Sequence, residues 1–96
     1  MNMAKLVPEK PNIVVRAEVF REGGLYVGFC PDLDVSSFGE SVDDARRSLR
    51  EALEAFLEEC EAMGTLQDVL EEAGFVRQDA NWLPRQPVSA ELLSLG

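Results

Sequence analysis

The stretch that decides the fold is SVDDARRSLREALEAFLEECEAMG, which runs from Ser41 to Gly64. Ser41 is a favourable N-cap, Asp44 can complete a capping box with it, and Gly64 suits the left-handed position that often ends a helix. Arg47–Glu51 and Arg50–Glu54 have the spacing of ion pairs along a helix. Between the caps, apolar residues recur every three or four positions, as in an amphipathic helix of about six turns. This apolar stripe consists of Val42, Ala45, Leu49, Leu53, Phe56, Cys60 and Met63.

The residues before this helix have the pattern of a β-meander. Ile13–Phe20 is rich in branched residues, and apolar and polar residues alternate in its second half. Gly23 and Gly24 supply the positive φ angles of a hairpin turn, and Leu25–Cys30 is the returning strand. Because a two-stranded hairpin alone would be marginal, we expect a third strand at Val35–Phe38. An exposed strand edge of such a meander would be a natural route to pairing with another chain.

The C-terminal part predicts less regular structure. Thr65 is expected to cap a shorter helix, Leu66–Ala73, which ends at Gly74 with Phe75 packing back onto it. Trp82-Leu83-Pro84 and Pro87 indicate an irregular stretch. Val88–Leu95 can be read as a strand or as a short helix, since periodicity does not decide.

The chain therefore predicts an α+β domain: a three-stranded antiparallel β-meander packed by one long helix and a short second helix, with a possible extra C-terminal strand. Residues 1–11 form a leader, residues 12–75 the domain, and residues 76–96 a C-terminal extension of it.

The charge of the chain is lopsided, with 9 basic and 18 acidic residues and a formal net charge of −9. An acidic field repels phosphate, so direct nucleic-acid binding is not expected. The same field suits a basic protein partner, or it simply keeps the protein soluble; both readings stay open. A chain of this size has one modest core, which favours a homo-dimer or a higher homo-oligomer.

No apolar run resembles a secretory signal or approaches the ~18 residues of a membrane span. We expect a cytoplasmic protein without membrane contact, in which Cys30 and Cys60 are reduced thiols.

The sequence offers few residues for catalysis. Histidine is absent and there are two separated cysteines, which leaves almost no zinc ligands and excludes Ser/His/Asp chemistry. Glu18 has no second carboxylate on its strand face to share a two-metal nuclease site, and Cys30 has no evident base. We expect a non-enzymatic protein without a metal or a cofactor.

The order of these motifs resembles one known family. Strand, Gly-Gly turn and strand are followed by Phe29-Cys30-Pro31-Asp32-Leu33-Asp34, then by Phe38-Gly39-Glu40-Ser41 and a Glu/Arg-rich helix. Over about Ile13–Leu57 this resembles the HicB-like antitoxins. The matching residues are Tyr26, Pro31, Asp32, Leu33, Gly39, Glu40 and Ser41, with Ala45 and Ala52 where the family's helix carries small residues. Many members continue Pro-Asp-Leu with Pro-Gly-Cys, whereas this chain has Asp34-Val35-Ser36.

The resemblance implies a partial ribonuclease-H-like fold that binds and masks a small basic HicA-type ribonuclease toxin. Residues 75–96 are too few and too rich in proline for the DNA-binding domain of full-length members, so only the masking half is expected. The predicted partner-binding residues are Tyr26, Phe29, Pro31, Asp32, Leu33 and Asp34. Alternatively, Pro31–Asp34 is ordinary turn chemistry, and the protein is an orphan structural or regulatory domain that acts through homo-oligomerisation with no toxin partner.

Overall fold

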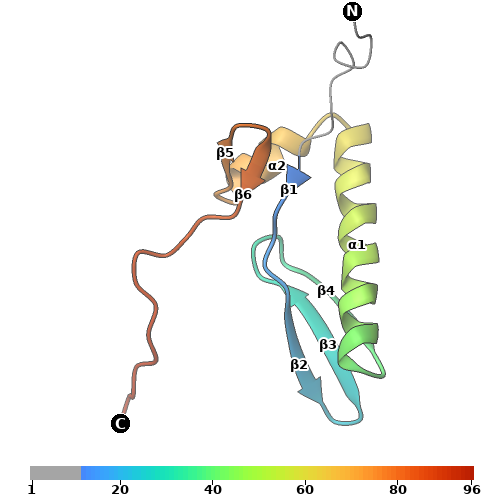
Figure 1. The fold of residues 1–96 in the computed structure, drawn as a ribbon, viewed down its shortest axis with the longest axis vertical. Helices are drawn as coiled ribbons and strands as arrows, with labels where there is room; N and C mark the ends of the chain where they lie inside the picture. The colour runs from blue at the N-terminus through green and yellow to red at the C-terminus, as the bar shows by residue number, and fades with distance from the viewer. Residues whose placement is uncertain (1–11) are drawn as a thin grey trace, which may run out of the picture.

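The computed structural model describes residues 12–96, so the predicted leader lies outside the described residues. The fold is α+β: a long helix packs on a three-stranded meander, which confirms the prediction (Figure 1). The elements are β1 (Asn12–Ile13), β2 (Glu18–Glu22), β3 (Leu25–Cys30), β4 (Val35–Gly39), α1 (Val42–Ala62), α2 (Leu66–Glu72), β5 (Val76–Gln78) and β6 (Asn81–Leu83).

The strands form two three-stranded sheets. The meander has the order β2-β3-β4 and is antiparallel throughout, whereas the second sheet has the order β1-β6-β5 with β1 parallel to β6. The prediction of one continuous strand over Ile13–Phe20 is therefore wrong in its middle. Residues 14–17, called the linker below, carry the chain from one sheet to the other. The N–H of Val14 donates to the carbonyl of Trp82 (2.9 Å), and the N–H of Arg16 donates to the carboxylate of Asp32 (2.9 Å).

Both readings of Val88–Leu95, as a strand and as a short helix, are wrong, since residues 84–96 form neither. Val88 and Leu92 are fully exposed and meet no surface on which a strand could pack. The additional strands are instead β5 and β6, in the region where the prolines indicated irregular structure. Trp82 on β6 is 6% exposed and packs with Leu70 and Phe75, and this buried tryptophan gives the hairpin its apolar anchor.

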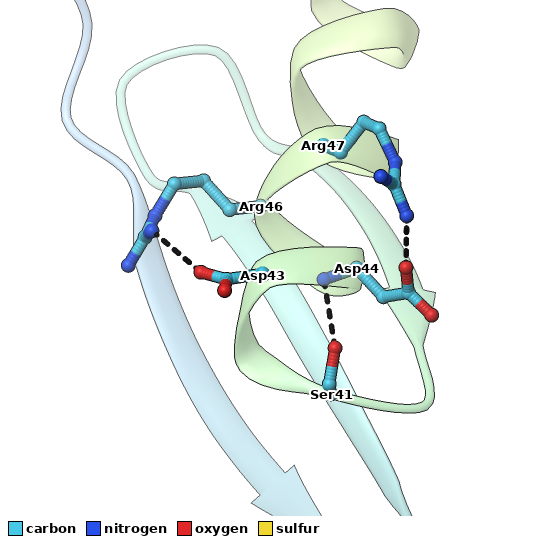
Figure 2. A network of polar contacts seen from close by, with 5 residues as sticks. All are labelled: Ser41, Asp43, Asp44, Arg46 and Arg47. Carbon is cyan, nitrogen blue, oxygen red and sulfur yellow. Dashed lines mark hydrogen bonds and ion pairs between the residues drawn. The ribbon is translucent and has the colours of Figure 1, made fainter.

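The first turn of α1 is held by side chains close in sequence (Figure 2). The hydroxyl of Ser41 accepts the N–H of Asp44 (3.0 Å), as the predicted N-cap requires. The carboxylate of Asp44 pairs with Arg47, and Asp43 pairs with Arg46 (3.1 Å). The predicted pairings of Arg47 with Glu51 and of Arg50 with Glu54 are both wrong for the described residues, since Arg47 pairs with Asp44 instead and no ion pair involves Arg50. The carboxylates of Asp43 and Asp44 also gain from the helix dipole at the N-terminus.

Both helices end in the same hydrogen-bonded motif. After α1, Gly64 has φ +73° and the N–H of Thr65 donates to the carbonyl of Cys60 (2.9 Å). After α2, the N–H of Phe75 donates to the carbonyl of Leu70 (2.9 Å), and both side chains are buried in one core, as predicted. Thr65 does not cap α2: its hydroxyl donates to the carbonyl of Cys60 (3.3 Å).

The meander lies directly against α1 because two glycines face the helix. A Cβ on Gly28 would lie 2.8 Å from the carbonyl oxygen of Ala45 and 3.1 Å from Leu49 Cβ, and a Cβ on Gly39 would lie 2.6 Å from the Ala45 nitrogen. Ala45 is itself fully buried. Small residues on both sides therefore set the distance between helix and sheet, and this close approach identifies which face of β3 is covered.

Candidate partner-binding surface

The predicted contact loop, Pro31–Asp34, is a turn that joins β3 to β4. Pro31 and Asp34 are exposed, and Asp34 adopts a left-handed backbone with φ 55°. Leu33 is half-buried and packs against both hydrophobic cores, beside Cys30 in one and Leu70 in the other. The turn thus sends one apolar side chain inward and leaves Asp34 in solvent.

Asp32 is a structural residue of this turn. Its side chain is 7% exposed, and its carboxylate accepts the backbone N–H of Arg16 (2.9 Å) and pairs with the Arg16 guanidinium (3.2 Å). The same guanidinium donates to the carbonyl of Arg85. Asp32 therefore ties the loop, the linker and the segment after β6 together, and Asp34 is the loop carboxylate that a partner can reach.

Tyr26 and Phe29 lie on opposite faces of β3, because they are an odd number of residues apart in a strand. Tyr26 lies on the face that packs on α1, opposite Gly39, and the guanidinium of Arg21 lies 5.9 Å from the centre of its ring. Phe29 lies on the other face, opposite Glu18 and Ser36. The six predicted residues do not form one site: they are divided among the core, the two sheet faces and the turn.

The meander carries an apolar surface that the sequence analysis missed. Phe20, Val27 and Phe38 are paired in register across β2, β3 and β4, and this row lies on the face turned away from α1. Phe20 is 51% exposed and Phe38 is 65% exposed. We call this surface the open face; it consists of Phe20, Leu25, Val27, Phe29 and Phe38. The alternation of residues along the strands indicates that each strand has two different faces. It does not indicate which of these faces α1 covers.

Carboxylates border the open face along β2. Glu18 shares a row with Phe29, and Glu22 is paired with Leu25 at the hairpin end. Both glutamates point to the same side as Phe20, since they lie two residues from it. An apolar centre with an acidic border is suited to a protein surface that combines apolar and basic side chains.

Beyond the open face, the described residues carry a concentration of acidic side chains towards the C-terminal ends of α1 and α2. From Glu51 onwards α1 carries Glu51, Glu54, Glu58, Glu59 and Glu61 with no basic residue, and the last turns of both α1 and α2 lack basic residues. Negative charge at a helix C-terminus opposes the helix dipole. The three arginines of α1 all lie in its first half, so the molecule presents an uncompensated acidic field beyond it.

The described residues offer little for chemistry. Cys30 is fully buried, and desolvation raises the pKa of its thiol, against the weaker opposing effect of the N–H groups of Leu33 and Asp32. Within residues 12–96 no three His, Cys, Asp or Glu side chains gather to hold a metal ion. Over the same residues, no helix has the length and apolar character needed to cross a membrane.

Compared with protein-family models, with curated proteins and with solved structures, the chain matches none. Its function must therefore be inferred from its own residues and geometry.

Proposed function

We propose that the protein is a non-catalytic, cytoplasmic antitoxin of the HicB-like type, which binds and masks a small basic ribonuclease of the HicA type. Two observations support the proposal before any surface is considered. The ordered residues from Tyr26 to Ser41 resemble that family, and the α+β fold of a meander packed by a long helix is the one that the resemblance implies.

The main support for the proposal is the exposed apolar surface of the open face. A contiguous apolar surface with half-exposed aromatic residues is typical of a protein interaction site, and buried aromatic side chains dominate the binding energy of interfaces. Full burial of one such side chain is worth about 1.5–3 kcal/mol. Phe20 and Phe38 expose 51% and 65% of their surface. Burial of this exposed surface by a partner would therefore supply a large part of that free energy.

The negative charge around the open face indicates the kind of partner. The border of Glu18 and Glu22, together with the net charge of −9, favours the approach of a basic protein and speeds its association. Asp34 extends the acidic surface, since its exposed turn follows the Phe29 end of β3. Of the six residues first predicted, we therefore retain Phe29, Pro31 and Asp34 as candidates for direct contact, with Asp32 holding their turn in place.

The proposal predicts that a small basic protein is encoded beside this one, and titration of the full chain with that protein tests it. Phe20→Ser is expected to weaken binding about 10- to 30-fold, which corresponds to about 1.4–2 kcal/mol of lost apolar contact. The matched control is Met63→Ser, since Met63 is 68% exposed at the end of α1, away from the open face. Absence of binding by the unmodified chain, or an equal loss in both variants, would contradict the proposal.

Electrostatic steering has its own test. Asp34→Lys and higher ionic strength should both slow association with the basic partner, while dissociation changes less. An association rate that is flat between low and high salt would remove the acidic field from the mechanism.

The alternative is an orphan domain that acts through homo-oligomerisation without a toxin. The outer edge of β4 favours it, because an edge strand of five residues without a charge can pair with a strand of another copy. A stable homo-dimer that binds no basic protein would select this alternative.

A further inference from the structure

Within residues 12–96 the two sheets have four edge strands, and β4 differs from the other three. β1 has two residues and β5 has three. β2 has five residues, but three of them are charged: Glu18, Arg21 and Glu22. Proteins prevent unwanted strand pairing with short edge strands and with charges on the edge. β4, with the sequence Val35-Ser-Ser-Phe-Gly39, has five residues and no charge.

The outer edge of β4 is also free within residues 12–96. β3 is its only strand neighbour, and no other backbone hydrogen bond of the described residues involves it. Its unpaired N–H and C=O groups can therefore template another strand.

We propose that β4 pairs antiparallel with β4 of a second copy of this chain, about a two-fold axis through Ser37. An antiparallel strand pair is self-complementary, which a two-fold interface requires. An axis at Ser37 pairs all five residues, so that Val35 faces Gly39 of the second copy and Ser36 faces its Phe38. Each three-stranded meander then becomes half of one continuous sheet.

This register brings the exposed aromatic residues of the two copies together. Phe38 lies on the open face with Ser36, since the two are two residues apart. Across the new strand pair, Phe38 contacts Ser36 of the second copy and reaches its Phe38 diagonally, at the ~7–8 Å separation within which aromatic side chains interact. The 65% exposed side chain thereby gains neighbours at the edge of the sheet, and the two open faces merge into one surface that still faces solvent.

The helix layer is compatible with this arrangement. A groove of about 430 Å³ between the linker and α1 is lined by Arg46, Arg50 and Leu57 among others, so that flank of α1 faces the linker. Helical periodicity places Ser48, Ala52 and Ala55 on the opposite flank, towards the outer side of β4. These three side chains are small and uncharged, which leaves room for a second helix at the level of Ser48. On the same stripe Asp44 is paired with Arg47, and Glu59 lies about one turn beyond Ala55.

The position of the axis agrees with this helix contact. Ser37 is paired with Gly28, and a Cβ on Gly28 would touch Ala45 and Leu49. The two-fold axis therefore passes close to the level of Ser48 on α1. Asp43 and Asp44 of α1 are paired with Arg46 and Arg47, and the acidic residues without such a partner begin at Glu51. In the antiparallel arrangement the later turns of the two helices point away from each other, which separates these charges.

The mass of the full chain in solution tests the proposal, measured by light scattering or sedimentation without any partner. The unmodified chain is expected to have twice its monomer mass of 10.6 kDa. Ser36→Lys places a positive charge beside Phe38 of the second copy and is expected to be monomeric at the same concentration. The control is Glu18→Lys, which puts the same side chain in the same row of the sheet but at the β2 edge; it should stay dimeric.

Amide exchange and a second variant complete the test. The β4 amides should exchange slowly in the unmodified dimer and faster in a folded Ser36→Lys monomer. If circular dichroism shows that Ser36→Lys is unfolded, the Ser48→Glu variant on the helix flank replaces it as the test. A folded Ser48→Glu monomer supports the proposed interface, and an unchanged dimer contradicts it. An unmodified chain that stays monomeric at high concentration, or dimer loss in Glu18→Lys alone, overturns the proposal. Because the mass is measured without a toxin, failure here leaves the proposed function untouched.

Discussion

Replacement of Gly28 by alanine should destabilise the fold by about 1–2 kcal/mol. The added Cβ would lie 2.8 Å from the carbonyl oxygen of Ala45 and 3.1 Å from Leu49 Cβ. A backbone atom of a helix cannot move aside alone, so the helix must shift from the sheet. Overpacking of this kind costs about 1–3 kcal/mol, and the lower flexibility of the unfolded chain returns about 0.4–1 kcal/mol.

Urea unfolding followed by circular dichroism measures the difference, at one protein concentration because self-association would add to stability. In a domain of this size, such a loss lowers the melting temperature by roughly 4–16 °C. The control is Gly24→Ala in the β2–β3 turn, where an added Cβ meets nothing within 4 Å; its effect should stay within about 0.5 kcal/mol. Equal stability of the two variants would refute the idea that contact between glycine and helix sets the spacing.

Three further predictions concern single residues. Asp32→Ala should lower the free energy of unfolding in urea by about 2 kcal/mol, because the N–H and guanidinium of Arg16 lose a charged partner. The control Asp34→Gly, at an exposed left-handed position, should lower it little. A similar loss in both variants would disprove the structural role of Asp32. Ser41→Ala should cost about 1 kcal/mol, since the N–H of Asp44 loses its cap, and an unchanged thermal melt would argue against it. The raised pKa of Cys30 means that the folded state favours the neutral thiol, so stability should be full below the thiol pKa of the unfolded chain and fall as the pH rises through the folded value. Unfolding at about pH 7 and about pH 10 measures this, and a Cys30→Ala variant that falls equally would assign the change to other groups.

Local features of the fold could be predicted from the sequence. The stripe, the Ser41 cap and the glycine at Gly64 each depend on residues a few positions apart, and each is found in α1. The hairpin turn at Gly23, which has φ +61°, is local in the same sense. For these elements the periodicity and the turn chemistry were sufficient.

Non-local pairing could not be predicted in this way. β1 has two residues and is a strand because it lies beside Trp82, and no pattern in its own sequence marks that partner. Asp32 has the same turn propensity whether its carboxylate points into solvent or to Arg16, so its structural role becomes visible only in the fold. The open face was missed for a related reason, since alternation defines two faces of β3 and only the contact of Gly28 with α1 decides which one is covered.

The bridge from Asp32 through Arg16 to the carbonyl of Arg85 has a consequence for the order in which the chain folds. It joins segments that are far apart in the sequence, and β1 likewise has no strand partner until β6 has been made. During synthesis from the N-terminus, the meander and α1 can form early from near neighbours. The strand pairing of β1 and the contact of Arg16 with Arg85 must wait for residues beyond 80 to leave the ribosome. The nascent chain should therefore acquire its β-meander before its second sheet, with the hydrogen bond from Arg16 to the carbonyl of Arg85 formed as one of the last steps.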